Sequence, residues 1–320
     1  MSARTRRTGP EPIIAENESA QIKIQPQART DLYSTFRVGG PADFLARVGT
    51  LEEIQLALQW ARASGYKLTV FGGGSNMLVS DRGIRGLVLV VRRTGKQAEG
   101  DLTIQDAGNE VVVTVPAAAP LSWFGRTAAE HGWQGMTWAV GLPGNVGGAV
   151  VNNAGAHGTE TKDGLVGVRI VDADGNVSEH SRAWLSPEYR RTTLKVAGNP
   201  RDLIVLDATF RFDKGDAGEL KDEADKHAEY RHATQPTGAC AGSIFKNPEG
   251  SYSGLVIEQA GLKGTRVGGA VVSEKHANFI VNDDGATAED IVGLMARVQA
   301  TIREQTGIEL HPEIERIGEW

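Results

Sequence analysis

The sequence has little of several features that would assign it to a specialised class of protein. It contains one cysteine, Cys240, in 320 residues, which excludes an intramolecular disulfide and favours a reducing compartment. No apolar stretch approaches the roughly 20 residues that a membrane span needs. The net charge is −6 and no basic stripe alternates with aromatic residues, so nucleic acid is not expected as a partner. We therefore expect a cytoplasmic globular protein with no membrane and no obligate protein partner.

Common catalytic and nucleotide-binding signatures are missing as well. The sequence has no G-x-G-x-x-G and no G-x-x-x-x-G-K-[ST], which excludes the Rossmann fingerprint and the P-loop. It has no H-E-x-x-H, no close His/Cys cluster and no G-x-S-x-G, so we expect neither a metal site nor a nucleophile elbow. Arg4, Arg6 and Arg7 are followed by a polar segment without an apolar core, so no secretory signal is expected.

Glycine is abundant, with 40 residues against 12 prolines, and it gathers in loops without a period. One loop, 72–76, reads GGGSN and follows the apolar strand predicted over 68–71. Another, 141–148, reads GLPGNVGG and continues through Asn153 and Gly155, with a helix expected to begin near Val146. Successive glycines expose backbone N–H groups that bind anionic oxygens, although such loops also serve as tight turns or close packing contacts. Together the loops predict a site for the two phosphates of a dinucleotide.

Local patterns predict a mixture of strands and helices. Thr50 and Glu53 form a capping-box pair before a helix, and Thr287 is the predicted N-cap of another. Strands are expected over 43–48, 68–71, 87–91, 111–115 and 203–212, and helices over 121–131 and 219–233. Residues 1–30 are polar and aperiodic, so we expect a flexible tail. Composition changes after Lys214, which predicts one domain over 31–213 and a second over 214–320.

The segment 241–248, AGSIFKNP, delivers a serine into a stiff turn. Gly242 permits backbone angles that other residues resist, and Pro248 blocks helix continuation. A hydroxyl held in that way can donate a proton inside a closed pocket. From the residues alone, Ser243 is equally compatible with a plain turn serine.

Five motifs in this order resemble UDP-N-acetylenolpyruvoylglucosamine reductase, a flavoenzyme family of bacterial peptidoglycan synthesis. They are GGGSN, GLPGNVGGAVVNNAG, Tyr189-Arg190, GSIFKNP and Leu310-His311-Pro312-Glu313-Ile314, and they span about 33–318. The resemblance implies an α+β fold. It consists of an FAD-binding domain made of two α/β subdomains of the vanillyl-alcohol-oxidase type, and a smaller C-terminal α+β substrate domain.

The resemblance also implies the reaction and its cofactors. FAD would be bound without a covalent link, NADPH would be the hydride donor, and the UDP-sugar substrate would carry an enolpyruvyl ether. Hydride from reduced flavin would reach the terminal vinyl carbon, and a proton would reach the adjacent carbon. The carboxylate would need charge stabilisation as the enol-like intermediate forms.

The implied roles map onto numbered residues of this chain. Ser243 is the expected proton donor, while Arg190 and Glu313 are expected to polarise the substrate carboxylate. Tyr189, Lys246 and Asn247 are expected at the substrate. The expected FAD contacts are Gly72, Gly73, Gly74, Ser75, Asn76, Gly141, Gly144, Gly147, Gly148, Asn153 and Gly155.

Several assignments have rivals within the sequence. Arg191 lies beside Arg190, and Glu309 and Glu315 compete with Glu313. The family usually reads Tyr-Arg-x-Ser, and this chain has Thr192 in the serine position. Cys240, His157 and His276 are interpreted as structural residues.

Only the short segment 249–254 joins the GSIFKNP motif to the next predicted helix, so the chain resembles the shorter subclass of the family. The resemblance therefore does not identify the residues that bind the uridine diphosphate, and Arg231 is one candidate. Two other functions compete with the reductase. One is an FAD-dependent sugar or alcohol oxidase, which would not need Ser243, Arg190 and Glu313. The other is a non-catalytic nucleotide-binding protein.

Overall fold

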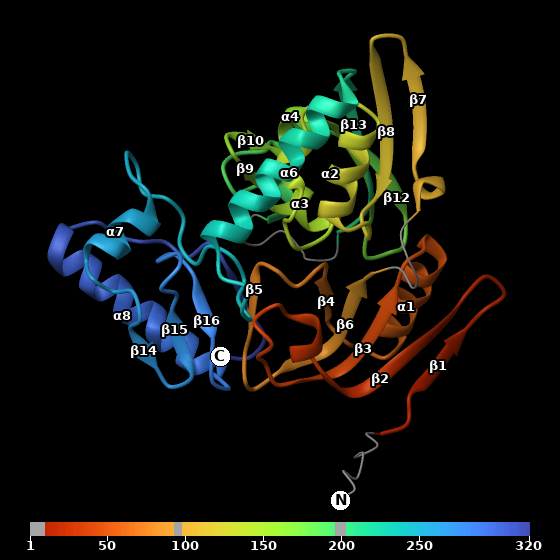
Figure 1. The fold of residues 1–320 in the computed structure, drawn as a ribbon. Coiled ribbons are helices and arrows are strands. Elements are labelled where there is room, and N and C mark those ends of the chain that lie inside the picture. Colours follow the sequence, from red (N-terminus) through yellow and green to blue (C-terminus); the bar gives the residue numbers. More distant parts are fainter. Residues whose placement is uncertain (1–9, 93–97, 196–202) are drawn as a thin grey trace, which may run out of the picture.

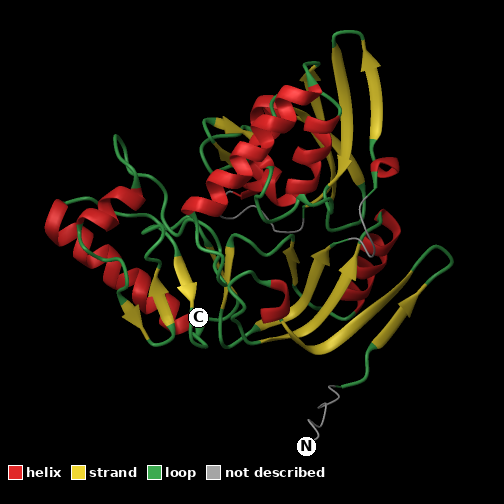
Figure 2. Ribbon diagram, in the orientation of Figure 1, coloured by secondary structure: helices red, strands yellow, loops and turns green. Residues whose placement is uncertain are grey.

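The protein was analysed as a computed structural model, which describes residues 10–92, 98–195 and 203–320. The elements group into an N-terminal lobe, a middle lobe and a C-terminal lobe, each containing a sheet with helices packed on it (Figures 1 and 2). The N-terminal and middle lobes are stacked in the view of Figure 1, and the C-terminal lobe lies beside both of them.

The N-terminal lobe is a five-stranded sheet in the order β1-β2-β3-β6-β4, covered by helix α1. Its elements are β1 (Ile13–Glu16), β2 (Gln21–Arg29), η1 (Asp31–Tyr33), β3 (Pro41–Val48), α1 (Leu51–Ala63), β4 (Leu68–Phe71), β5 (Met77–Val79) and β6 (Ile84–Val91). Helix α1 begins with the predicted capping box of Thr50 and Glu53, and its buried residues include Ile54, Leu58 and Ala61. Strands β3, β6 and β4 run parallel, so β4 ends at the sheet edge where the first glycine loop begins.

The prediction of a flexible tail is wrong for residues 13–29. Strand β2 pairs with β3 and β1 pairs with β2, both antiparallel. Ile22 and Ile24 are buried whereas Lys23 between them is exposed, so one face of β2 contributes to the core. Residues 1–9 lie outside the described residues.

The middle lobe is an antiparallel five-stranded sheet in the order β12-β11-β13-β8-β7, with helices packed on one of its faces (Figure 1). Its elements are η2 (Glu99–Asp101), β7 (Thr103–Ala107), β8 (Glu110–Pro116), α2 (Leu121–Glu130), η3 (Thr137–Ala139), α3 (Val146–Asn152), β9 (Gly155–Ala156), β10 (Thr159–Glu160), α4 (Thr161–Gly164), β11 (Leu165–Val171), β12 (Val177–Ser181), α5 (Arg182–Leu185), η4 (Thr193–Lys195), β13 (Ile204–Asp213) and α6 (Ala217–Thr234).

Helix α6 belongs to the middle lobe by its packing. Its Ala224 is buried against Ala129 of α2 and Val140, and Figure 1 shows the two helices side by side. The predicted boundary at residue 214 places this helix in the C-terminal domain. The packing therefore favours a boundary after α6, later in the chain than the composition change indicated.

The C-terminal lobe is a three-stranded sheet packed on a long helix. Its elements are α7 (Ser253–Gln259), β14 (Arg266–Val267), β15 (Ala270–Val272), β16 (Ile280–Asn282), α8 (Ala288–Thr306) and β17 (Glu315–Ile317). Helix α8 begins after the predicted N-cap Thr287 and buries the predicted apolar stripe, which includes Ile291, Leu294 and Met295. No helix among the described residues is both long enough and apolar enough to cross a membrane.

The end of the chain returns to the N-terminal lobe. Strand β17 pairs in parallel with β5, so Glu315 lies opposite Met77, directly after the first glycine loop. This pairing brings the Leu-His-Pro-Glu-Ile motif next to residues that are far away in the sequence.

Candidate active site

A cavity of about 560 Å³ lies where the three lobes meet. Its walls change in character along its length. Apolar side chains of Val91, Leu121 and Val205 line one part, while Arg190, Ser243 and Glu313 line another. A volume of this size is typical of small-molecule sites. The cavity therefore combines an apolar binding surface with a group of polar side chains suited to chemistry.

The first glycine loop lines this cavity along its whole length, from Gly72 to Asn76. Gly74 has φ +69°, and a Cβ there would lie 1.9 Å from the carbonyl oxygen of Tyr33, so no other residue fits without backbone movement. Among the described residues, the backbone N–H groups of Gly73, Gly74 and Ser75 have no hydrogen-bond acceptor. Three successive unused donors form the kind of concave surface that binds a phosphate.

The second loop has a different role from the first. The N–H groups of Val146, Gly147 and Gly148 are already bonded, to the carbonyl oxygens of Ala119 and Ala117 and to Asn145 Oδ1 respectively. A Cβ on Gly73 would lie 2.4 Å from the Cα of Gly144, so the two loops touch through their backbones. Gly144, Gly147 and Gly148 line the cavity, yet the last two act as surface rather than as N–H donors.

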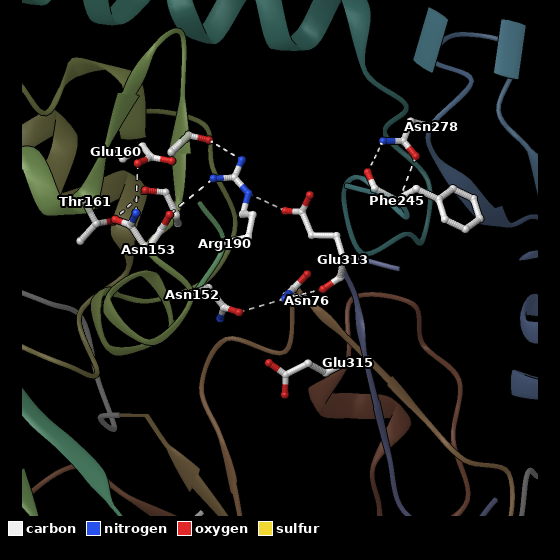
Figure 3. Close-up of polar contacts among 12 residues, drawn as sticks. Asn76, Asn152, Asn153, Glu160, Thr161, Arg190, Phe245, Asn278, Glu313 and Glu315 are labelled. Carbon is white, nitrogen blue, oxygen red and sulfur yellow. Dashed lines mark hydrogen bonds and ion pairs between the residues drawn. The ribbon is translucent and has the colours of Figure 1, made fainter. Parts of the chain in front are cut away.

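Arg190 and Glu313 form an ion pair at the polar part of the cavity (Figure 3). Arg190 Nε donates to Glu313 Oε1 at 2.7 Å, and the two side chains are 19% and 14% exposed. The guanidinium also donates to the carbonyl oxygens of Gly155 at 2.9 Å and Asn153 at 3.4 Å. Arg191 points to solvent near Glu188, and Glu309 does not line the cavity. Glu315 lines the cavity beside Lys195, so the ion pair with Arg190 distinguishes Glu313 from its rivals.

The turn that carries Arg190 is held by its neighbours. Arg190 has φ +55°, a conformation that costs a non-glycine residue about 1–3 kcal/mol and that is concentrated at functional sites. Thr192 is buried, and its hydroxyl donates to the carbonyl oxygen of Val151 at 2.7 Å. Asn153 donates to the carbonyl oxygen of Glu188 at 2.9 Å. The threonine that replaces the usual serine therefore keeps a hydroxyl anchor beneath the arginine.

Ser243 lines the cavity on a segment that is fixed along both edges. On one edge, the Glu313 N–H donates to the Ile244 carbonyl at 2.8 Å, and the Lys246 N–H donates to the His311 carbonyl. On the other, the Asn278 side chain accepts from the Phe245 N–H at 3.0 Å and donates to its carbonyl at 2.8 Å (Figure 3). Ser243 and Glu313 thus lie on two segments that are hydrogen-bonded to each other.

The remaining predicted residues lie around this group rather than within it. Asn153, Tyr189, Lys246 and Asn247 are not part of the cavity lining, and Gly141 lines a neighbouring cavity. Asn153 is buried and supports Arg190, whereas Tyr189 is 45% exposed with the Arg190 guanidinium 5.0 Å from its ring centre. The Asn247 side chain accepts a hydrogen bond from the Ser253 N–H at 3.1 Å. Substrate contacts by Tyr189, Lys246 and Asn247 stay predictions.

Asn152 and Lys195 line the cavity but are not among the predicted site residues, and Glu315 was considered only as a rival of Glu313. Lys195 Nζ lies 2.5 Å from Asn152 Oδ1 and 3.4 Å from Glu315 Oε1, and all three residues line the cavity. Burial lowers the pKa of Lys195, and Lys246 lowers it further, while Glu315 and Glu313 raise it. Asn152 lies within the recognised second motif and Lys195 follows Tyr189-Arg190 closely, but their meeting with Glu315 depends on the β5–β17 pairing.

A second cavity, of about 670 Å³, adjoins the first. The two share lining residues that include Gly72, Gly73, Gly242 and Arg231. Burial lowers the pKa of Arg231, and within the described part of the chain this side chain has no ion-pair partner. A desolvated arginine without a carboxylate is a suitable partner for an anionic group of a ligand.

Cysteine and histidine chemistry is not supported in this region. Burial raises the pKa of the Cys240 thiol, which keeps it protonated and unreactive near neutral pH. His157 stacks on His227 with ring centres 4.1 Å apart, and His276 accepts from the Asn278 N–H through Nδ1. Across the described ranges, no three His, Cys, Asp or Glu side chains are grouped as a metal would require.

The main cavity fits an extended dinucleotide such as FAD. The unused N–H donors of Gly73, Gly74 and Ser75 suit a diphosphate, and the apolar wall suits a ring system. The polar group of Arg190, Ser243 and Glu313 lies at the same cavity, where a flavin and a substrate can meet it. The N–H donors of the glycine loop and the apolar wall therefore fit FAD, the cofactor expected from the sequence.

Comparisons with protein families divide the chain into two known domains. Residues 42–181 match the family described as FAD binding domain. Residues 234–317 match the family described as UDP-N-acetylenolpyruvoylglucosamine reductase, C-terminal domain. The second match begins at the end of α6, where the packing also places the boundary.

Similar proteins cover the chain from end to end. A UDP-N-acetylenolpyruvoylglucosamine reductase of Synechocystis sp. is 40% identical over 323 residues, covering 100% of this chain and 99% of that protein. One of Synechococcus sp. is 42% identical over 292 residues, covering 89% and 90%. The crystal structure of the reductase from Thermus caldophilus has a TM-score of 0.73 at 32% identity, covering 92% and 98%. The α+β fold expected from the sequence is confirmed, and the chain belongs to the UDP-N-acetylenolpyruvoylglucosamine reductase family.

Proposed function

We propose that the protein reduces UDP-N-acetyl-3-O-(1-carboxyvinyl)-glucosamine to UDP-N-acetylmuramate with NADPH, in the synthesis of peptidoglycan precursors. The observation that carries this proposal is the convergence of Ser243, Arg190 and Glu313 on one cavity beside a phosphate-binding glycine loop. A sugar or alcohol oxidase would need the glycine loop but not these three side chains. The family membership supports the same reaction.

The overall chemistry adds one hydride and one proton across the vinyl group. FAD held by the unused N–H groups of Gly73, Gly74 and Ser75 would supply the two-electron redox chemistry that links NADPH to the terminal vinyl carbon. NADPH is thereby oxidised to NADP⁺, the terminal carbon becomes a methyl group, and the adjacent carbon requires a proton. The protein must hold the substrate carboxylate, stabilise the negative charge that develops there and deliver that proton.

Arg190 is placed to stabilise the developing charge. Three of the five guanidinium N–H donors are used by Glu313, Gly155 and Asn153, which leaves two for the substrate carboxylate. The bonds to the two carbonyl oxygens fix the guanidinium before substrate binds, so little reorganisation is needed during reaction. Glu313 balances the positive charge of Arg190 and fixes the orientation of its guanidinium.

Ser243 is the proposed proton donor. Serine is a weak acid, so its hydroxyl gives up a proton only to a strongly basic centre such as the carbon next to the carboxylate. The backbone bond between Glu313 and Ile244 keeps this donor in a constant position relative to the charge-stabilising pair. A fixed donor also delivers the proton to one face of the substrate.

The uridine diphosphate is proposed to extend toward Arg231 and the second cavity. That cavity begins beside Gly242, next to Ser243, and contains an arginine without an acidic partner in the described chain. A substrate with its vinyl group near Ser243 would place its phosphates along this path. Cytoplasmic location and non-covalent FAD stay predictions, supported by the single cysteine and by the reaction class.

The direct test of the function is product formation. Protein purified with FAD, and given NADPH and the enolpyruvyl substrate, is expected to yield UDP-N-acetylmuramate, identified by mass spectrometry, with one NADPH consumed per product. NADPH consumption that yields hydrogen peroxide and no UDP-N-acetylmuramate would instead favour an oxidase.

A further inference from the structure

Lys195 is a buried cation that the reaction described above leaves unexplained. It ends η4, its side chain is 15% exposed, and it lines the same cavity as Arg190, Ser243 and Glu313. Placing an ammonium group in such surroundings costs several kcal/mol unless anionic or polar partners compensate for the lost hydration. A methionine or leucine would fill this space without that cost, so the charge calls for a functional reason.

The partners of Lys195 connect it to the C-terminal segment. Its Nζ donates to Asn152 Oδ1 at 2.5 Å, and the same oxygen lies 3.2 Å from Asn76 Nδ2 (Figure 3). The Asn76 carbonyl in turn accepts from the Glu315 N–H at 3.0 Å. Lys195 therefore contacts the end of α3 and strand β17, and both of these are hydrogen-bonded to Asn76 of the first glycine loop.

The charges around Lys195 come from several elements. Glu315 lies 3.4 Å away, on β17, and Glu313 precedes it on the same segment. Lys246, from the GSIFKNP motif, opposes the ammonium charge. Glu313 is already paired with Arg190, which leaves Glu315, at 29% exposed, as the nearest carboxylate of Lys195. One partly hydrated carboxylate balances the buried cation incompletely.

The proposed reaction supplies further negative charge in this cavity. A hydride brings two electrons and one proton, so reducing a bound flavin makes the local charge more negative by one unless a second proton follows. A cation fixed nearby stabilises the reduced form more than the oxidised form. Lys195 is a positively charged residue of the cavity, and it takes no part in the Arg190–Glu313 ion pair.

We infer that Lys195 is the charge that favours the reduced state of the bound cofactor, with Asn152 and Glu315 holding the ammonium group in place. The inference rests on the proposed function for the presence of a flavin. It assigns Lys195 a positioning and electrostatic role rather than a proton-transfer step.

The test is the midpoint reduction potential of the bound flavin, measured in the holoenzyme by reductive titration against a reference dye, without the sugar substrate. In Lys195→Met, the equilibrium constant for reducing the bound flavin is expected to fall at least tenfold. For a two-electron couple, a tenfold fall shifts the midpoint potential by about 30 mV to more negative values. Lys195→Arg keeps the charge and is expected to stay closer to the wild-type value. Glu315→Gln removes the opposing charge and is expected to shift the potential the other way.

Lys226→Met removes an exposed lysine from α6 that does not line the cavity, and it is expected to leave the potential near that of the wild type. Asn152→Ala removes a hydrogen-bond partner of Lys195 without removing the charge, and it is expected to shift the potential in the same direction as Lys195→Met but by less. An unchanged potential in Lys195→Met, or an equal shift in Asn152→Ala, would overturn the inference.

If Lys195→Met does not retain flavin, the sign of the Glu315→Gln shift decides, since a positive shift is expected and a zero or negative shift contradicts the role. A wild-type protein that binds no flavin at all would instead contradict the proposed function.

Discussion

The guanidinium of Arg190 meets three acceptors at the polar part of the cavity, and they come from two distant stretches of chain. Glu313 belongs to the C-terminal segment, whereas Asn153, the C-cap of α3, and Gly155 of β9 lie two residues apart. A planar group with donors on all edges can satisfy these positions together, while an ammonium group cannot. The geometry therefore requires arginine rather than positive charge alone.

Replacing Arg190 with lysine is expected to lower kcat by about 10²–10³-fold, the scale of losing one preorganised charge-stabilising contact. Flavin affinity should change much less, because the diphosphate cradle at Gly73–Ser75 is untouched. Steady-state kinetics and flavin titration of Arg190→Lys and Arg190→Met test this together. Loss of flavin with normal turnover in the reconstituted fraction would place Arg190 in the cofactor site.

Ser243→Ala is expected to leave flavin bound and still reducible by NADPH, while product formation falls by about 10²–10⁴-fold, the usual contribution of a general acid. The proton donor acts after hydride has reached the substrate, so the first half-reaction should be unaffected. Stopped-flow absorbance of each half-reaction measures the two steps separately. Ser243→Thr, which keeps a hydroxyl, is the matched variant, and normal turnover of Ser243→Ala would exclude the assigned role.

At the scale of elements, the segment 243–246 is hydrogen-bonded along both edges, as a strand in a sheet would be. On one edge the Asn278 side-chain amide bonds the N–H and the carbonyl of Phe245, and on the other edge residues 311–313 pair with the segment. Asn278 is 3% exposed, so its hydrogen bonds are sheltered from water. The position of Ser243 thus depends on an asparagine outside all of the recognised motifs.

Asn278→Ala is expected to destabilise the protein by about 2–4 kcal/mol, because it leaves the buried N–H and carbonyl of Phe245 unsatisfied. Activity should fall more than stability alone explains, since Ser243 loses its support. Urea denaturation and kcat at a temperature where the variant is folded measure the two effects. Gln305→Ala, on the exposed side of α8, is the control and should stay within about 0.5 kcal/mol of the wild type.

Elements with local chemical signals were predicted well from the sequence, and those that depend on distant pairing were not. The caps at Thr50 and Thr287 need only nearby residues, and helices α1 and α8 begin where these predicted. Strand β2 was missed because Pro26 interrupts its alternation and the strand is ordered by its pairing with β3 rather than by a local signal. The same distinction holds for the site. Local motifs indicated Arg190 and Glu313, whereas Lys195 and Glu315 are brought together only by the pairing of β5 with β17.

At the scale of the whole molecule, stability depends on the protonation of histidines packed within the lobes. His276 is partly buried in the C-terminal lobe, and burial is the main cause that lowers its pKa. Its Nδ1 accepts the Asn278 N–H at 3.2 Å, which requires the neutral ring. Burial also lowers the pKa of His157, and His227 and Arg231 lower it further.

These shifts predict that stability falls as the pH decreases. Below a pH of about 6.5 the unfolded chain takes up protons on these histidines, while the folded chain resists until a lower pH. The unfolded state therefore binds more protons in this window, and the free energy of unfolding decreases as the pH is lowered through it. Urea denaturation between pH 7.5 and 5.5 is expected to show the decrease.

His276→Gln should make the decrease in stability smaller, because the variant cannot be protonated at this position. His311→Gln, which removes an exposed ring, serves as the control. A decrease of the same size in wild type and His276→Gln would contradict the contribution assigned to His276.

We propose that both halves of a flavin-dependent reduction take place in one cavity. The most direct measurement is an anaerobic absorbance spectrum near 450 nm of the flavin-bound protein, first with NADPH and then with the enolpyruvyl substrate. We expect the absorbance to bleach on the first addition and to recover on the second, without oxygen. Bleaching with no recovery would contradict the reductase assignment, and a protein that takes up no flavin would contradict the role of the glycine loop.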